Sequence, residues 1–481
     1  MNKLKNVKND EIMPNILEGF LKKGRFFVLF EIESPILQNM ETNILDNAFE
    51  IQEAVTSHNT IPAALAVLDK QNEPTSFNTV NFAGKLFDKN HLNVLYLSGK
   101  SANADNIKRN LKKCIEYGIK NVVPVTGNAY DFSKIKNLKK SACFDSCHTL
   151  HIIKKEFNNS ILFPGATVNP FKYEPDILFS QYFKLIKKLN FGANFIVAQA
   201  GWDMLKYQEL RWYMNERDYN YPTIGRFLFL NQKKLDDIQK NKCPGIFISR
   251  DLHIILEKEK KFSHVQFASA QWRRLQIIAS GLKLLGYNAI QISGLNSAHL
   301  AKTALNKINE AFDELNNFEK WLQAYSDHFF RSDMAPFEHR YYLYKNLFSE
   351  QYTNEKFKDK KRISQCSFMM KTKFKLAKKL FSKSHLLDPN ENKFSKTLLM
   401  NCKSCAYCRL PLMHYICPET CPKGLANGPC GGSSVDGHCE VYNNKKCIHI
   451  KRTQIAAWLN QIDILEERYI RHPNQGEKTK I

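Results

Sequence analysis

Cysteine is the residue that most constrains this chain, because eight of its thirteen cysteines fall within 46 residues near the C-terminus. The sequence between them is rich in glycine and proline, as in CPKGLANGPCGG. A segment this short, with so few large apolar residues, is too small to bury a hydrophobic core of its own. Cross-links must therefore hold it together, and the residues able to form them are Cys402, Cys405, Cys408, Cys417, Cys421, Cys430, Cys439 and Cys447.

Eight thiols are the number of ligands that two tetrahedral zinc ions or two [4Fe-4S] clusters require. The run Cys402-x2-Cys405-x2-Cys408 with a later Cys-Pro pair is similar to ferredoxin ligation, although the gap to the fourth cysteine is longer. Disulfide bonds are the alternative. The N-terminal MNKLKNVKNDE lacks the apolar core of a secretory signal, so we expect a cytoplasmic, reducing location and favour metal over disulfides. The choice between iron-sulfur clusters and zinc stays open.

Short β-rich runs alternate with helical patterns through the first part of the chain. Eight strands with helices between them predict an α/β fold, a (β/α)8 TIM barrel over residues 15–315. A ninth apolar run at 245–249 begins next to Pro244 and Gly245, and we interpret it as a loop. The expected strands are Phe26–Glu31, Pro62–Leu68, Leu92–Ser98, Asn121–Thr126, Ile161–Thr167, Asn194–Gln199, Thr223–Leu230 and Asn288–Ser293.

Helical spacing of apolar residues predicts helices at Asp105–Tyr117, Asp176–Leu189 and Ser269–Leu285, with Asp105 as the N-terminal cap of the first. A glycine follows each of these helices and precedes a strand, where a helix stop is expected. These glycines are Gly118, Gly192 and Gly286.

The pattern changes after the barrel. Residues 331–400 hold 16 Lys and Arg against 7 Asp and Glu, interleaved with aromatic residues. We expect two or three helices in a basic linker over 316–398, which joins the barrel to a small cysteine-rich metal or cluster domain over 399–471. A basic helix at Phe368–Phe381 suits a membrane surface, but packing of its apolar face on the neighbouring domain is the preferred interpretation. A last helix is expected at Thr453–Tyr469.

The formal net charge is +23, which is typical of many nucleic-acid-binding proteins. The basic residues are spread along the whole chain, however, and no helix-turn-helix, homeodomain or RNA-recognition pattern is present. No apolar run approaches the ~20 residues that span a bilayer. We therefore expect neither a nucleic-acid partner nor a membrane.

Polar residues collect at the predicted ends of the strands. In barrels of this type the C-terminal ends of the strands form the active-site rim. One polar residue at a strand end is commonly structural, but several strands deliver such residues to the same predicted rim. They are Glu31, Ser98, Thr126, Gly127, Asn128, Asn169, Gln199 and Asp203.

The cysteine segment resembles a known domain. The motif CPKGLANGPCGG, followed by DGHCEVY and KC, is similar to the cysteine-rich C-terminal domain found with methylenetetrahydrofolate reductases. This domain is fused behind the reductase barrel in some bacteria, and in acetogens it belongs to a partner subunit with iron-sulfur clusters.

The barrel resembles the same family, a set of flavoenzymes with a (β/α)8 fold. The segments FEIESP, YGIKNVVPVTGN, GATVNP and KKLNFGANFIVAQAGWD carry the similarity. The resemblance implies FAD, NAD(P)H as electron donor and a folate substrate. It makes Glu31 the general acid, implies that Gln199 is a second catalytic residue, and places Gln199 and Asp203 near the substrate. The residues implied to line the flavin are Ser98, Thr126, Gly127, Asn128, Asn169 and Lys188.

Two positions depart from the family pattern. Asn128 stands where the family has a flavin-facing Asp, and Tyr96 stands in place of a His. The neutral amide removes a negative charge that would stabilise a cationic folate intermediate. Either change is consistent with altered specificity or with a barrel that has lost part of its catalysis.

The leading hypothesis is a methylenetetrahydrofolate reductase, in which flavin-mediated hydride transfer converts 5,10-methylenetetrahydrofolate to 5-methyltetrahydrofolate. The alternative is a non-catalytic or electron-relay partner subunit with a folate-reductase-like barrel and iron-sulfur clusters. A methyltransferase that handles methylfolate shares the barrel but explains the cysteines no better. A homo-oligomer or a redox partner protein is compatible with either main hypothesis.

Overall fold

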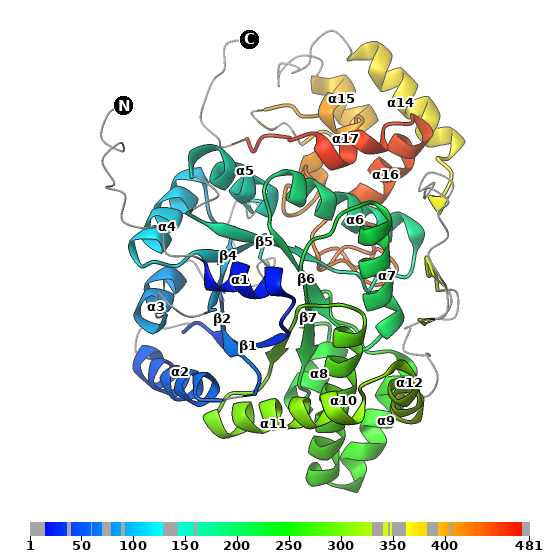
Figure 1. Cartoon of the computed structure of the whole chain (residues 1–481). Helices are drawn as coiled ribbons and strands as arrows, with labels where there is room; N and C mark the ends of the chain where they lie inside the picture. The colour runs from blue at the N-terminus through cyan, green and yellow to red at the C-terminus, as the bar shows by residue number, and fades with distance from the viewer. Residues whose placement is uncertain are drawn as a thin grey trace.

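A computed structural model shows a barrel with a smaller C-terminal region packed on one side of it (Figure 1). The structure describes residues 15–35, 40–58, 60–69, 78–87, 92–127, 143–157, 161–329, 340–344, 347–348, 362–381, 393–403, 405 and 407–473. Asn128 lies outside these residues.

Eight parallel strands close into a barrel in the order β1 to β8, with β8 paired back to β1. All eight strands were expected from the sequence, and each lies within a few residues of its predicted bounds. The run at 245–249 is a loop, as predicted. The strands are β1 (Phe27–Glu33), β2 (Ala63–Leu68), β3 (Val94–Ser98), β4 (Asn121–Val125), β5 (Phe163–Val168), β6 (Phe195–Ala200), β7 (Thr223–Leu228) and β8 (Ala289–Ser293).

Helices surround the barrel, and the predicted (β/α)8 fold is confirmed. Three helices lie between β7 and β8, whereas single helices join the other consecutive strands in the described part of the chain. The helices up to the end of the barrel are α1 (Ile16–Lys23), α2 (Glu41–Thr56), α3 (Thr79–Leu86), α4 (Ala104–Glu116), α5 (Ser146–Glu156), α6 (Pro175–Asn190), α7 (Met204–Glu216), α8 (Gln232–Gln239), α9 (Arg250–Phe262), α10 (His264–Leu284) and α11 (Ala298–Glu314).

Alternation along the strands separates the barrel interior from the layer between strands and helices. On β1, Phe27 and Leu29 belong to a small apolar cluster with residues of the other strands, while Val28 and Phe30 belong to the large cluster beneath the helices. Successive side chains of a strand point to opposite faces, so this division follows from the period of two. Helix α1 closes the N-terminal end of the barrel with Leu17 and Leu21, which join the interior cluster.

Two local expectations needed correction. The side chain that caps α4 is that of Asn103, which accepts a hydrogen bond from the Asn106 amide, and Asp105 lies in the first turn instead. An acidic residue in the first turn still interacts favourably with the helix dipole. The expected helix at Thr453–Tyr469 is two helices, α16 (Ile448–Trp458) and α17 (Ile462–Glu467), because Asn460 adopts φ 57° between them. Such a left-handed residue ends an α-helix.

The linker contributes α12 (Phe318–Phe329), α14 (Phe368–Leu380) and α15 (Lys393–Met400). As preferred from the sequence, α14 packs an apolar face on the cysteine region: Ala377 contacts the cluster around Cys408, and Phe374 lies edge-on to Trp458. Its first residue, Phe368, is exposed on the surface.

The C-terminal region lies against α5 and α6 of the barrel, where Figure 1 shows its orange and red segments. Arg217 pairs with Glu466 at 2.8 Å, and Lys187 donates to the carbonyl of Arg468. His148 of α5 contacts the Tyr469 hydroxyl at 2.9 Å and packs edge-on against His472. Two short 3-10 turns in this region, Pro411–Met413 and Pro418–Thr420, connect the cysteines.

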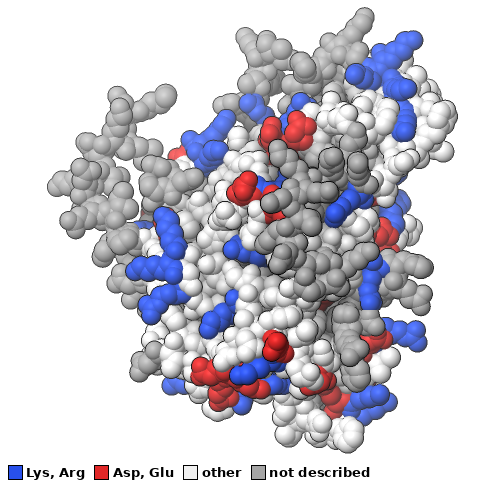
Figure 2. Space-filling view, turned by 45° about the vertical axis from the view of Figure 1, so that its right-hand side comes forward, with Lys and Arg blue, Asp and Glu red and all other residues white. Residues whose placement is uncertain are grey.

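Basic residues are distributed over the surface. On the face in Figure 2, Lys and Arg side chains are scattered among neutral atoms in the described part, and acidic side chains lie between them. No helix among the described residues is long and apolar enough to cross a membrane.

Helix α1, which closes the N-terminal end of the barrel, gives a stability prediction. Leu17 is fully buried, so Leu17→Ala should lower the free energy of unfolding by about 2–5 kcal/mol through lost burial and a residual cavity. Urea unfolding followed by circular dichroism measures this. Lys22→Ala on the exposed side of the same helix is the control, and an equal loss in both variants would show that α1 does not close the barrel.

The histidines at the interface with the C-terminal region give a pH prediction. Burial lowers the pKa of His148 to about 3, with Asp145 opposing and His472, Arg409 and Lys184 adding to the decrease. The unfolded chain protonates histidine near pH 6.5, so it binds more protons than the folded protein below that pH, and stability should fall as the pH drops from 6.5 to 4. His148→Phe should make this loss shallower in thermal melts. An unchanged pH profile in His148→Phe would contradict the assignment.

Candidate functional site

A layer of polar side chains crosses the barrel interior above the apolar layer. The interior positions of β1, β6, β7 and β8 are Leu29, Val197, Ile224 and Ala289, and each is followed two residues later by a polar residue. The period of two therefore brings these polar residues to the C-terminal end of the barrel, where barrel enzymes place their active sites. With a tyrosine from β3, the layer consists of Glu31, Tyr96, Gln199, Arg226 and Gln291.

Glu31 is the centre of this layer. Its Oε1 accepts hydrogen bonds from Arg226 Nε at 2.8 Å, Arg226 Nη2 at 2.5 Å and Gln291 Nε2 at 2.6 Å. Arg226 Nη1 also donates to Gln199 Oε1 at 2.8 Å, and the Tyr96 hydroxyl donates to Gln291 Oε1 at 2.7 Å. The structure thus joins Glu31 and Gln199, the two residues expected to be catalytic, through one guanidinium.

The electrostatics of the layer follow from burial and this ion pair. Burial opposes the charge of Arg226, but the Glu31 carboxylate outweighs it and raises the pKa of the guanidinium. Burial also raises the pKa of the Tyr96 phenol far above its usual range, so this hydroxyl stays protonated and acts as a hydrogen-bond donor.

Sequence reasoning missed Arg226 and Gln291. The signal was present, because an arginine inside the apolar run TIGRFLFL and a glutamine inside AIQIS are unusual in buried strands. It also missed Asp69, just past the end of β2, which accepts hydrogen bonds from Thr79 Oγ1 and the Ser98 amide. Burial raises the pKa of Asp69 to about 6, so this carboxyl group is a second candidate proton donor at the rim.

The residues expected to line the flavin are held by contacts within the protein. Ser98 Oγ accepts from the Lys100 amide, and Thr126 Oγ1 donates to Asp145 at 3.3 Å. Lys188 donates to the Thr167 carbonyl at 2.7 Å and is almost completely buried. Its ammonium group is therefore bound at the end of β5.

The cysteine region covers the ends of β4 and β5. Lys423 donates to the Gly127 carbonyl at 2.8 Å, and Asn169 Nδ2 donates to the carbonyls of Gly431 at 2.7 Å and Gly245 at 2.9 Å. The approach is close: a Cβ on Gly245, where φ is +78°, would lie 2.5 Å from the Gly431 oxygen. In this arrangement the C-terminal segment binds the Gly127 carbonyl and the Asn169 amide, two of the groups expected to line the flavin.

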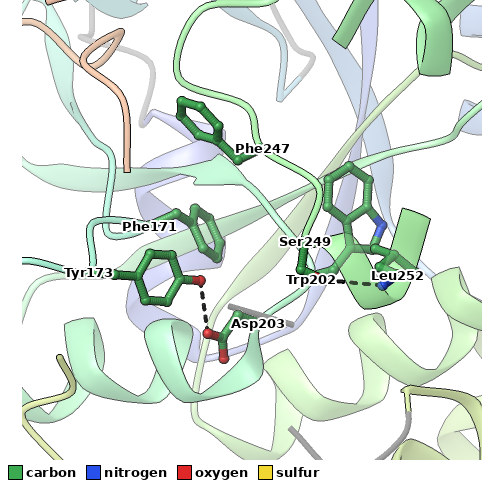
Figure 3. A pocket seen from close by; sticks show the side chains of 7 residues that line it. All are labelled: Phe171, Tyr173, Trp202, Asp203, Phe247, Ser249 and Leu252. Carbon is green, nitrogen blue, oxygen red and sulfur yellow. Dashed lines mark hydrogen bonds between the residues drawn. The ribbon is translucent and has the colours of Figure 1, made fainter. Parts of the chain in front are cut away.

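Asp203 lies beside a small cavity of about 10 Å³ (Figure 3). Its carboxylate accepts hydrogen bonds from the hydroxyls of Tyr173 at 2.9 Å and Tyr342 at 2.7 Å. It also accepts one from the Leu205 amide and so caps the N-terminus of α7. The cavity is the size of about one water molecule. These contacts give Asp203, which was expected near the substrate, a role in joining the linker to the barrel.

Several cysteines of the C-terminal region lie close enough to affect one another's pKa. Burial raises the pKa of Cys421 to about 12, with Cys430 and Cys439 adding to the increase, and burial together with Cys430, Cys421 and Cys439 raises the pKa of Cys447. The other four interact in the same way, with Cys402 affecting the thiols of both Cys408 and Cys417, and Cys417 affecting that of Cys405.

The number of cysteine thiols suits two metal sites, but the thiols are not arranged around a metal position in this structure. None of the thirteen cysteines, all of which lie in the described part of the chain, forms a disulfide bond in this structure. Among the described residues, no three Cys, His, Asp or Glu side chains are arranged to hold a metal ion as they stand. Eight thiols are nevertheless the number of ligands that two zinc ions or two four-iron clusters require.

Comparisons with known proteins agree with the resemblance. The profile of the family described as methylenetetrahydrofolate reductase matches residues 16–295, and that of the methylene-tetrahydrofolate reductase C-terminal domain matches residues 384–475. No curated protein sequence matches the chain.

Two solved structures illustrate how distant the structural neighbours are. An uncharacterized protein from Clostridium thermocellum that binds two copies of 5-methyl-5,6,7,8-tetrahydrofolic acid is 14% identical, covers 62% of this chain and 100% of its own, and has a TM-score of 0.45. The dihydropteroate synthase of Yersinia pestis is 11% identical, with coverages of 61% and 94% and a TM-score of 0.33. Similarities this remote carry no functional weight.

The family profile, by contrast, spans more than half of the chain and includes all eight barrel strands. The chain therefore belongs to the methylenetetrahydrofolate reductase family and carries that family's C-terminal domain behind the barrel.

Proposed function

We propose that the protein reduces the methylene carbon of 5,10-methylenetetrahydrofolate to give 5-methyltetrahydrofolate at the C-terminal mouth of the barrel. The observation that carries this proposal is the polar layer around Glu31 and Gln199, which lies in an otherwise apolar barrel interior. The methylene carbon accepts hydride only after the five-membered ring opens to an iminium ion, and opening requires a proton at N10.

The side chains of the layer have definite capacities for this reaction. Oε1 of Glu31 is fixed by three donors, whereas Oε2 makes no hydrogen bond to the described residues and is the atom able to carry a proton. The Gln199 oxygen accepts from Arg226 and from the Ala200 amide, which leaves its NH2 group to donate to the substrate. Because the Glu31 carboxylate is paired with Arg226, proton transfer from Glu31 to the folate requires that this ion pair loosens when folate binds.

The second part of the proposal concerns the source of the electrons that reduce the folate. Enzymes of the family generally use a bound flavin, which passes hydride from NAD(P)H to the folate. The ends of β4 and β5 are covered by the segment around Lys423 and Gly431, so we assign no step to FAD at that position. The cysteine groups would hold [4Fe-4S] clusters, which supply one-electron transfer, or zinc, which supplies structural cross-links.

The role of Glu31 is tested by removing its proton. Glu31→Gln keeps the size and hydrogen-bonding capacity of the side chain, and it should slow formation of 5-methyltetrahydrofolate ~10²–10⁴-fold, the usual contribution of a general acid. Product formation with a reduced viologen dye as donor measures the rate, and Asp69→Asn is assayed alongside as the second candidate acid.

The matched control is Glu209→Gln. Glu209 is also a buried carboxylate paired with a cation, Lys206 at 3.0 Å, but it lies on α7 outside the polar layer. This variant should melt at a lower temperature while its folded fraction keeps the wild-type rate. Equal rate losses in the two variants would assign Glu31 a structural role.

A second candidate function is that of a redox partner protein that binds folate or another protein and relays electrons. The covering of the β4 and β5 ends by the cysteine region favours it. Anaerobically purified protein should be tested for FAD release on denaturation and for reduction of methylenetetrahydrofolate with NADH or NADPH. Bound FAD with activity supports the reductase. Protein without FAD, active only after a separate flavoprotein is added, supports the relay.

A further inference from the structure

Helix α14 has two apolar faces, and only one of them packs against the described part of the protein. The packed face contains Phe374, Ala377 and Phe381, which are buried against the cysteine region and recur at helical spacing. The other face is open: Phe368 is 85% and Met369 is 66% accessible to solvent. Packing on the neighbouring domain, which was preferred from the sequence, therefore accounts for the first face and leaves the second one without a partner among the described residues.

The exposed apolar face extends along α14 and continues onto α15. Leu376 and Leu380 follow Phe368 at multiples of four residues, so the three lie on one ridge of the helix. On α15, Phe394 is 82% and Leu398 is 74% accessible, and they lie one turn apart. The two helices contact each other, and Figure 1 shows α14, in yellow, at the outer edge of the C-terminal region. We call the exposed faces of these helices the outer surface; its apolar residues are Phe368, Met369, Leu376, Leu380, Phe394 and Leu398.

Every charged residue of α14 and α15 is a lysine, and neither helix contains Asp or Glu. Lys371 lies over the Trp458 ring at 5.7 Å, and Lys396 is buried. The others are exposed: Lys373, Lys375, Lys378, Lys379 and Lys393. The outer surface thus combines large apolar side chains with charge of a single sign, and it is complementary to a partner that is both anionic and apolar.

The junction of α9 and α10 provides a comparison within the same molecule. Phe262 and Val265 are 80% and 75% accessible there, as exposed as the apolar residues of the outer surface. Helix α9, however, carries acidic as well as basic residues, and Figure 1 places it at the opposite end of the molecule from α14. Exposed apolar residues therefore occur elsewhere on the protein without the uniform positive charge.

The charge and composition of the outer surface favour a lipid partner over a protein. A second copy of the chain would bring the same positive charge against this surface, and like charges across an interface repel. Protein interfaces are depleted in lysine and enriched in arginine, tyrosine and tryptophan, and α14 and α15 contain none of these three. At a membrane, phenylalanine and leucine enter the boundary below the headgroups while long lysine side chains reach the phosphates.

We propose that the outer surface of α14 and α15 docks the protein on a membrane that contains anionic lipids. Phe368, Met369, Phe394 and Leu398 enter the interface between headgroups and acyl chains, and the five exposed lysines bind the lipid phosphates. Docking of this kind is interfacial and reversible. It revises the expectation, drawn from the sequence, that the protein has no membrane partner, and it is independent of the reduction proposed above.

The docking is tested by flotation of full-length protein with lipid vesicles. Vesicles of phosphatidylcholine and phosphatidylserine should bind the protein, and vesicles of phosphatidylcholine alone should bind much less. Binding should weaken as the salt concentration rises, because at 1 M salt charges are screened beyond about 3 Å. Absence of binding to the vesicles with phosphatidylserine would overturn the proposal, and so would equal binding to the two lipid compositions.

Two variants separate the apolar and the charged contributions. Phe368→Gln/Phe394→Gln should lower the partition constant about 10-fold or more, because two aromatic side chains no longer leave water. Lys375→Gln/Lys379→Gln should lower binding to the vesicles with phosphatidylserine about 25-fold, which is about 5-fold for each lysine. It should leave the weak binding to phosphatidylcholine unchanged.

The matched control is Phe262→Gln/Val265→Gln, which removes equally exposed apolar side chains from the junction of α9 and α10. This variant should bind vesicles like the wild type. An equal loss in the control and in Phe368→Gln/Phe394→Gln would overturn the assignment to α14 and α15. All substituted positions are exposed, so thermal melts should match the wild type. If the phenylalanine variant is unstable, the lysine variant and the salt dependence of the wild type decide the question.

The same variants identify other occupants of the outer surface. Light scattering without vesicles gives the mass of the protein in solution. A wild-type oligomer that becomes a monomer in Phe368→Gln/Phe394→Gln would overturn the proposal in favour of a second copy. Wild-type vesicle binding in that variant would show that the apolar face serves another partner, such as an acidic protein, and would overturn the proposal as well.

Discussion

The packing of the C-terminal region on the barrel depends on buried lysines of the barrel. These lysines bind backbone carbonyl groups of a segment that has few large side chains. Residues 427–433 are rich in glycine and proline, so their carbonyl groups are what they present to a partner. Lys184 donates to the carbonyls of Gly428 and Pro429, and Lys172 to those of Gly431 and Ser433. Long side chains from the barrel thus satisfy the backbone of the C-terminal region, and the small residues allow the two surfaces to approach.

The polar layer of the barrel shows how the positive charge of Arg226 changes the chemistry expected of Glu31. Considered alone, a glutamate at the end of the first strand is a suitable proton donor. Beside Arg226, the same carboxylate is half of an ion pair that also holds Gln199. The chemistry of Glu31 is therefore a property of the whole polar layer.

Much of the fold was predictable, because each strand is a short apolar run in the sequence. The helices before three of these strands end at Gly118, Gly192 and Gly286, which all adopt a positive φ. The barrel followed from the alternation of strand and helix patterns, and the family followed from sequence motifs. The site was predictable only in part. Glu31 and Gln199 belong to one polar layer, but Arg226, which hydrogen-bonds to both, was overlooked in a strand whose other residues are mostly apolar. Contacts between distant segments, such as Asn169 with Gly431, have no local sequence signal, since they arise from packing of two domains.

The placement of the C-terminal segment against the barrel has a consequence for how the protein is made. The ribosome releases the barrel first and the cysteines last, and domains generally fold in the order of synthesis. The carbonyls of 428–433 have no partner until α6 and the loop before it are in place. Maturation is therefore ordered, because the finished barrel acts as the template on which the thiol-rich C-terminal segment folds last.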